Sequence, residues 1–150
     1  MRRPRGPEPW TYQDTLRALG AVADAWNVPT IHLTVSPEGV RIRMAAHPSE
    51  RRYRWPQLVR MAEARARLRG RRPPAPTPPT ARWEVILRLA GRAMDACDSS
   101  EFRIVAARGG VGRAATCQVE APEGPVLTTE QFVVQQIKLA HRYWSRGRRG

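Results

Sequence analysis

Two segments of the chain, 71 residues apart, resemble each other closely enough to constrain the whole fold. LRALGAVADA (16–25) and LRLAGRAMDA (87–96) are identical at five of ten aligned positions. Those matches are Leu16/Leu87, Arg17/Arg88, Gly20/Gly91, Asp24/Asp95 and Ala25/Ala96. Later matches keep the same order: Gln57/Gln131 and Val59/Val133, then RGRR at 69–72 and at 146–149. Because an arginine-rich composition would not preserve this order, we interpret the chain as a tandem duplication.

The duplication divides the chain into segments. We expect a basic flexible N-terminal arm at 1–10, a first repeat at 11–70, a second repeat at 81–147 and a basic C-terminal tail at 148–150. Five of the ten residues at 71–80 (RRPPAPTPPT) are proline. This composition is typical of an extended, semi-rigid linker.

Each repeat is predicted to fold as helix, strand, strand and helix. Apolar residues recur at intervals of three and four from Tyr12 to Trp26, which predicts an amphipathic helix, and Thr11 is placed to cap it. Alternating apolar residues predict strands at 30–35 and 40–45, and a second helix follows at 55–69. The second repeat is expected to have a helix at 83–97, a strand around 102–104, a loop at 108–112, a strand at 113–119 and a helix starting near 128.

One αββα unit of about 60 residues buries little apolar surface alone. We therefore predict an α+β fold in which tandem αββα repeats form a pseudo-twofold four-stranded antiparallel sheet, with the helices packed on one face. The competing arrangement is a pair of separate small domains on a proline-rich hinge.

Positive charge is concentrated in three stretches. The chain has 26 Lys and Arg residues against 13 Asp and Glu, for a formal net charge of +13. Residues 1–10, 50–72 and 138–150 carry +2, +7 and +5, whereas the rest of the chain is close to neutral. Codon bias would explain why arginine replaces lysine, but not this clustering. A polyanionic partner is the interpretation we favour.

The remaining composition indicates a reduced, cytoplasmic protein. No apolar run approaches the ~20 residues that a membrane-spanning helix needs. No apolar segment follows the basic N-terminal residues, so no secretory signal is expected. Cys97 and Cys117 have no metal-type spacing and no disulfide framework.

The polar face of the predicted sheet is the first candidate site. Alternation directs His32, Thr34, Arg41 and Arg43 to one side in the first repeat, and Arg103, Arg113, Thr116 and Gln118 to the same side in the second. Guanidinium groups suit phosphate because they donate two hydrogen bonds in one plane and stay charged. An ordinary solvated sheet face would carry similar residues.

The ends of the two second helices are the second candidate site. Both RGRR segments lie there, and aromatic residues accompany the C-terminal one. The residues expected to contact phosphate are Arg65, Arg67, Arg69, Arg71, Arg72, Arg142, Arg146, Arg148 and Arg149. Cations also suit the negative end of a helix dipole, but that effect accounts for one or two of them only.

These patterns predict a non-enzymatic nucleic-acid-binding protein that contacts the phosphate backbone, with double-stranded DNA favoured over RNA because two related clusters suit a duplex. The alternative is a protein-interaction subunit of a larger nucleic-acid-processing or ribonucleoprotein complex, with Trp10 and Trp55 as interface anchors. Enzyme motifs are weak: Asp95 and Asp98 could hold a metal, but Asp24, the counterpart of Asp95, has Asn27 in place of the second carboxylate, and the glycine-rich loop at 108–112 lacks a phosphate-loop pattern. We predict no catalytic residue, metal or cofactor.

Overall fold

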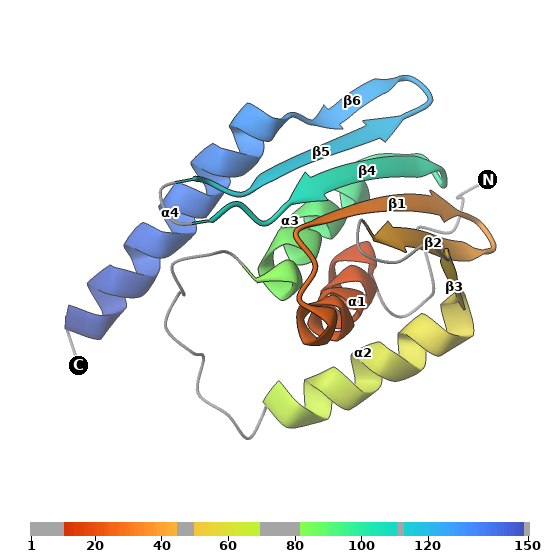
Figure 1. Ribbon diagram of the computed structural model, residues 1–150, viewed down its shortest axis with the longest axis horizontal. Coiled ribbons are helices and arrows are strands. Elements are labelled where there is room, and N and C mark those ends of the chain that lie inside the picture. Colours follow the sequence, from red (N-terminus) through yellow and green to blue (C-terminus); the bar gives the residue numbers. More distant parts are fainter. Residues whose placement is uncertain (1–10, 45–49, 70–81, 111–112, 149–150) are drawn as a thin grey trace.

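The computed structural model describes residues 11–44, 50–69, 82–110 and 113–148, and within these the side chains of 68–69, 140 and 142–148 are left out. This part of the chain forms four helices and one antiparallel sheet of six strands, with the helices on one face of the sheet (Figure 1). The elements are α1 (Tyr12–Trp26), β1 (Thr30–Ser36), β2 (Gly39–Met44), β3 (Arg51–Arg54), α2 (Trp55–Arg69), α3 (Trp83–Asp95), β4 (Phe102–Ala107), β5 (Thr116–Ala121), β6 (Gly124–Leu127) and α4 (Thr129–Arg148).

The predicted four-stranded sheet is wrong, because each half contributes three strands. The strand order is β3-β2-β1-β4-β5-β6, and every neighbouring pair is antiparallel. The strands that the αββα prediction omitted, β3 and β6, have four residues each and lie at the two edges. Strand β5 also begins at Thr116, three residues later than expected. The described element order is therefore helix, three strands, helix in each half.

Strands β1 and β4 join the two halves at the centre of the sheet, where Leu33 pairs with Ile104. Their inward side chains and those of the flanking strands share one apolar core with α1 and α3. Trp83 is completely buried in this core, and its indole N–H donates to the carbonyl oxygen of Val28 at 2.9 Å. One sheet and one core exclude the alternative of two separate domains.

Helices α1 and α3 run antiparallel and each caps the other. The Asp24 carboxylate accepts hydrogen bonds from the backbone N–H groups of Trp83 (2.7 Å) and Glu84 (3.2 Å) at the start of α3. The Asp95 carboxylate accepts from the corresponding groups of Tyr12 (2.9 Å) and Gln13 (3.1 Å) at the start of α1. These carboxylates satisfy N–H groups that have no partner inside their own helix.

Two glycines allow the α1–α3 pair to approach closely. A Cβ atom at Gly20 would lie 2.7 Å from the Cα of Glu84, and one at Gly91 would lie 2.7 Å from the Cα of Gln13. Both obstacles are backbone atoms, which cannot rotate away. The Gly20/Gly91 and Asp24/Asp95 matches thus have one structural meaning. In each pair, both residues contact the first turn of the opposite helix, at the two ends of the α1–α3 pair.

The predicted helix starts are correct in detail. The Thr11 hydroxyl accepts from the backbone N–H of Asp14 at 3.2 Å. At the start of α4, the backbone N–H of Gln131 donates to the Thr128 hydroxyl, and the Gln131 side chain accepts from the N–H of Thr128. This reciprocal pair is a capping box.

No helix in the described residues is both long and apolar enough to cross a membrane.

Candidate nucleic-acid interface

The outer face of the sheet, opposite the helices, is rich in arginine. Alternation along β1 and β2 exposes His32, Thr34, Arg41 and Arg43, and buries Leu33 and Ile42 between them. Strand β4 exposes Arg103 in the same way. The predicted side-chain directions in these three strands are confirmed.

Residues predicted for the second half of this face are placed less uniformly. Gln118 is exposed and Thr116 is half-buried on β5. Arg113 is exposed but lies before β5, where it forms an isolated bridge with Gly110. Arg113 is therefore in the connection between β4 and β5, outside the strand in which it was expected.

Strand β3 adds two arginines that the sequence analysis did not assign to the sheet. Arg52 pairs with Arg41, and Arg54 pairs with Gly39, so both lie on the outer face. Arg51 points to the opposite face, where its guanidinium lies 4.5 Å from the centre of the Trp26 ring. The signal in the sequence was the alternation within RRYR, with Tyr53 half-buried between the exposed Arg52 and Arg54.

The strand register places three of these arginines in one row across the sheet. Thr34 on β1 pairs with Arg41 on one side and with Arg103 on the other, and Arg41 pairs with Arg52. Neighbouring strands are about 4.8 Å apart, so the row from β3 to β4 spans roughly 14 Å. Arg43 and Arg54 lie beside this row. We call Arg41, Arg43, Arg52, Arg54 and Arg103 the outer-face arginines.

Among the described residues, the outer face offers cations but no large aromatic side chain. None of the side chains that the described strands direct to this face is phenylalanine, tyrosine or tryptophan. The one ring on it is the His32 imidazole, and Tyr53 lies on the helix side. One described contact involves an outer-face arginine: Nε of Arg52 lies 4.0 Å from the Glu50 carboxylate, and the Arg52 side chain is 71% exposed. An exposed pair at this distance is weak.

The arginines predicted at the helix ends are only partly described. Arg67 is exposed on α2. Arg69, Arg142, Arg146 and Arg148 lie in α2 or α4, but their side chains are outside the described set. Arg71, Arg72 and Arg149 lie outside the described residues altogether, as do the arm at 1–10 and the linker at 71–80.

Arg65 is occupied by a carboxylate of its own chain. It donates to Glu84 at 2.6 Å, and Arg17 donates to the other oxygen of Glu84 at 2.9 Å. Burial opposes ionisation of Glu84, but the hydrogen bonds and charges of the two arginines outweigh it, so its pKa lies below the usual value. This cluster connects α2 and α1 to the start of α3, and leaves Arg65 poorly placed for an external phosphate.

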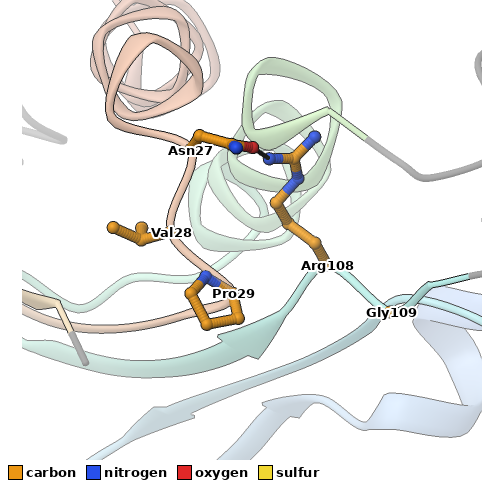
Figure 2. A pocket seen from close by; sticks show the side chains of 5 residues that line it. All are labelled: Asn27, Val28, Pro29, Arg108 and Gly109. Atoms are coloured by element: carbon orange, nitrogen blue, oxygen red, sulfur yellow. Dashed lines mark hydrogen bonds between the residues drawn. The ribbon is translucent and has the colours of Figure 1, made fainter. Parts of the chain in front are cut away.

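The glycine-rich connection after β4 borders a shallow, open depression (Figure 2). Asn27, Val28, Pro29, Arg108 and Gly109 line it. The Arg108 guanidinium points to Asn27 and donates to its side-chain oxygen at 2.8 Å, and the backbone N–H of Arg108 donates to Pro29 at 3.0 Å. These bonds fix the end of β4 against the loop after α1, which is a structural role.

Asp95 and Cys117 are both parts of the structural framework. Asp95 caps α1, and the described residues contain no group of three or more His, Cys, Asp or Glu that could hold a metal ion. Burial raises the pKa of the Cys117 thiol to about 12. A thiol with such a pKa is a poor nucleophile at neutral pH.

Trp55 is an integral part of the fold, and this argues against its predicted role as an interface anchor. Its indole N–H donates to the carbonyl oxygen of Ser36 at 3.1 Å, and its ring centre lies 5.7 Å from that of Tyr12. Trp10 lies outside the described residues.

Comparisons with protein-family models, with curated proteins and with solved structures found no match to this chain.

Proposed function

We propose that this protein binds nucleic acid, without catalysis, by contacting the phosphate backbone across the outer face of its sheet. The observation that carries the proposal is the set of five outer-face arginines on β2, β3 and β4. The sheet fixes the backbone positions of these arginines, and each guanidinium group can donate two hydrogen bonds to a phosphate. The net charge of +13 would also attract a polyanion from a distance.

A duplex suits this face better than an unpaired strand. Proteins that bind single strands usually stack bases on exposed aromatic side chains. The described outer face has five arginines and the His32 imidazole but no phenylalanine, tyrosine or tryptophan, which favours phosphate contacts over base stacking. We favour double-stranded DNA over RNA, with little dependence on base sequence.

The duplication and the helix-end clusters extend this proposal. If the halves arose from one αβββα unit, the RGRR segments at 69–72 and 146–149 mark related positions and would add phosphate contacts around the sheet. The reciprocal Asp24 and Asp95 caps support the duplication. Arg65 is left out of the interface because it is bonded to Glu84. We also propose a cytoplasmic location, which the two free cysteines support.

The test is a fluorescence titration of a random-sequence DNA duplex over a range of salt concentrations. We expect tight binding at low salt, with a slope of log K against log[salt] that reflects the number of phosphate contacts. Combined Arg41→Ala, Arg43→Ala and Arg52→Ala substitutions should flatten that slope by about 2.7, which is about 0.9 per lost contact. Duplex RNA and single-stranded DNA of the same length should bind more weakly.

A matched control removes the same charge from the helix side. Arg60, Arg82 and Arg92 are exposed on α2 and at the two ends of α3. Their combined replacement by alanine should leave the slope nearly unchanged. Equal weakening by both triple variants would show that only net charge matters, and absence of duplex binding by the unaltered chain would overturn the proposal.

A second candidate function is the docking of a protein partner, as a subunit of a larger nucleic-acid-processing complex. The favouring observation is on α4, where Val134 and Ile137 are 46% and 60% exposed. In the sequence, Val133, Ile137, Ala140 and Trp144 are spaced by four, three and four residues, which predicts one apolar stripe along this helix. Under this alternative the isolated chain would bind duplex poorly, and Ile137→Ser would weaken assembly with the partner without changing the fold.

A further inference from the structure

The row of arginines across the outer face ends at an acidic residue. Arg103 on β4 pairs directly with Glu120 on β5, and both side chains are exposed. Residues paired in this way face the same side of the sheet about 5 Å apart, so opposite charges attract each other. Read from β3 to β5, the row is Arg52, Arg41, Thr34, Arg103, Glu120.

The two halves of the face differ in charge at corresponding places. The offset of 71 residues that aligns α1 with α3 also aligns His32 with Arg103. Arg43 pairs with His32 in the first half, and Glu120 pairs with Arg103 in the second. In the same way Arg41 corresponds to Gln118, because Arg41 pairs with Thr34 and Gln118 with Val105. A cation in the first half is thus replaced by an anion or a neutral residue in the second.

We propose that Glu120 is a specificity-determining residue that limits the phosphate path to strands β3, β2, β1 and β4. The inference rests on the proposed function and identifies the bound element as one phosphate backbone of a duplex. A phosphate beside Arg103 would also lie beside the Glu120 carboxylate, which repels it and competes for the guanidinium. The unobstructed part of the row is roughly 14 Å long, enough for a few successive phosphates of one strand.

The experiment replaces Glu120 and measures duplex affinity and salt slope on the full chain. Glu120→Gln should tighten binding about threefold at low salt and should steepen the slope by up to about 0.9, because Glu120 no longer competes with the phosphate for Arg103. Asp98→Asn is the matched control, since Asp98 is exposed in the loop after α3 and its replacement changes the net charge equally. That variant should change neither quantity appreciably.

A second pair of variants tests the coupling between the two side chains. In an Arg103→Ala background, the gain from Glu120→Gln should fall to the level of the Asp98→Asn control. If Glu120→Gln behaves like that control in the unaltered background, Glu120 is not the limit of the path and the inference is wrong, although the proposed function stands if the outer-face triple variant still weakens binding. A wild-type chain that binds no duplex would overturn both.

Discussion

Asp24 and Asp95 perform the same task in opposite directions: each accepts two backbone N–H groups from the first turn of the helix that carries the other. Burial raises the pKa of Asp24 above its usual value, although the N–H groups of Trp83 and Glu84 and the charge of Arg108 favour the ionised form. The two carboxylates hold the halves of the chain together at both ends of the α1–α3 pair. Each half therefore supplies hydrogen-bond acceptors for the first turn of the other half's first helix.

Loss of either carboxylate should destabilise the whole chain. Asp95→Ala leaves the N–H groups of Tyr12 and Gln13 without their partner, and we expect a decrease of about 1–2 kcal/mol in the free energy of unfolding. Asp24→Ala should have a similar effect at the start of α3. Urea denaturation followed by circular dichroism measures both. Asp98→Ala, at an exposed loop position, should be neutral, and a comparable loss there would contradict the capping role.

Alanine at Gly91 should be destabilising although alanine is the better helix former. The added Cβ would lie 2.5 Å from the carbonyl oxygen of Tyr12, so α1 and α3 would have to separate. Alanine gains about 1 kcal/mol in helix propensity, but the steric cost of the Cβ is larger. The net result should be a decrease of about 1–3 kcal/mol in the free energy of unfolding. Gly110→Ala is the control, because nothing lies within 4 Å of its added Cβ. Thermal unfolding measures both variants. A Gly91→Ala chain that unfolds at a higher temperature than wild type would show that α1 and α3 are not in close contact at this position.

The Glu84 cluster should make stability depend on acidity. Because the pKa of Glu84 in the folded chain lies below the ordinary value of 4.5, its ionised form stabilises the fold above that pH. This contribution should be complete at pH 7 and be lost as pH falls through the lowered pKa. Glu84→Gln should therefore lower the free energy of unfolding by about 1–3 kcal/mol at pH 7, and the difference from wild type should vanish under acidic conditions. A difference that stays constant from pH 7 to pH 3 would contradict the ion-pair account.

The two thiols should react differently in the folded protein. Cys117 is buried, with a pKa of about 12, so about one molecule in ten thousand carries the thiolate at pH 8. Cys97 is partly accessible, although burial and the charge of Glu123 raise its pKa. A disulfide reagent such as Ellman's should thus modify at most one thiol in the folded chain, and slowly. In urea, where the chain is unfolded, it should modify both thiols. Cys97→Ser should abolish the reaction of the folded chain, and rapid labelling of that variant would show that Cys117 is accessible.

The long elements of the fold were predictable from the sequence. A three- and four-residue spacing predicted α1 from Tyr12 to Trp26, and the predicted range of α2 matches the structure. Two-residue alternation predicted which way Arg41, Arg43 and Arg103 point. These signals are strong because each element is amphipathic along its whole length.

The edge strands were not predictable in the same way. Four residues allow few alternations, so RRYR is only a weak strand signal. Strand β3 is defined by its pairing with β2, which the sequence does not reveal. In β6, Pro125 is unfavourable for a strand, and proline within a sheet is confined mainly to edge strands such as this one. The bond between Arg65 and Glu84 was also hidden, because it depends on how α2 packs near α3.

The repeated Gly and Asp positions could be recognised in the sequence but not explained by it. Gly20 matched Gly91, and Asp24 matched Asp95, without any sign that each pair meets the first turn of the opposite helix. That meaning depends on the antiparallel arrangement of α1 and α3. The third strand of each half then widens the face on which the arginines lie.

The central pairing of β1 with β4 has a consequence for how the outer face can change. In an assembly of two identical chains, a mutation at one site also occurs at the equivalent site of the other subunit. Here the strands on either side of that pair belong to a single polypeptide, so residue 43 can be arginine while residue 120 is glutamate. One flank can be redesigned for a new ligand while the other is kept as it is.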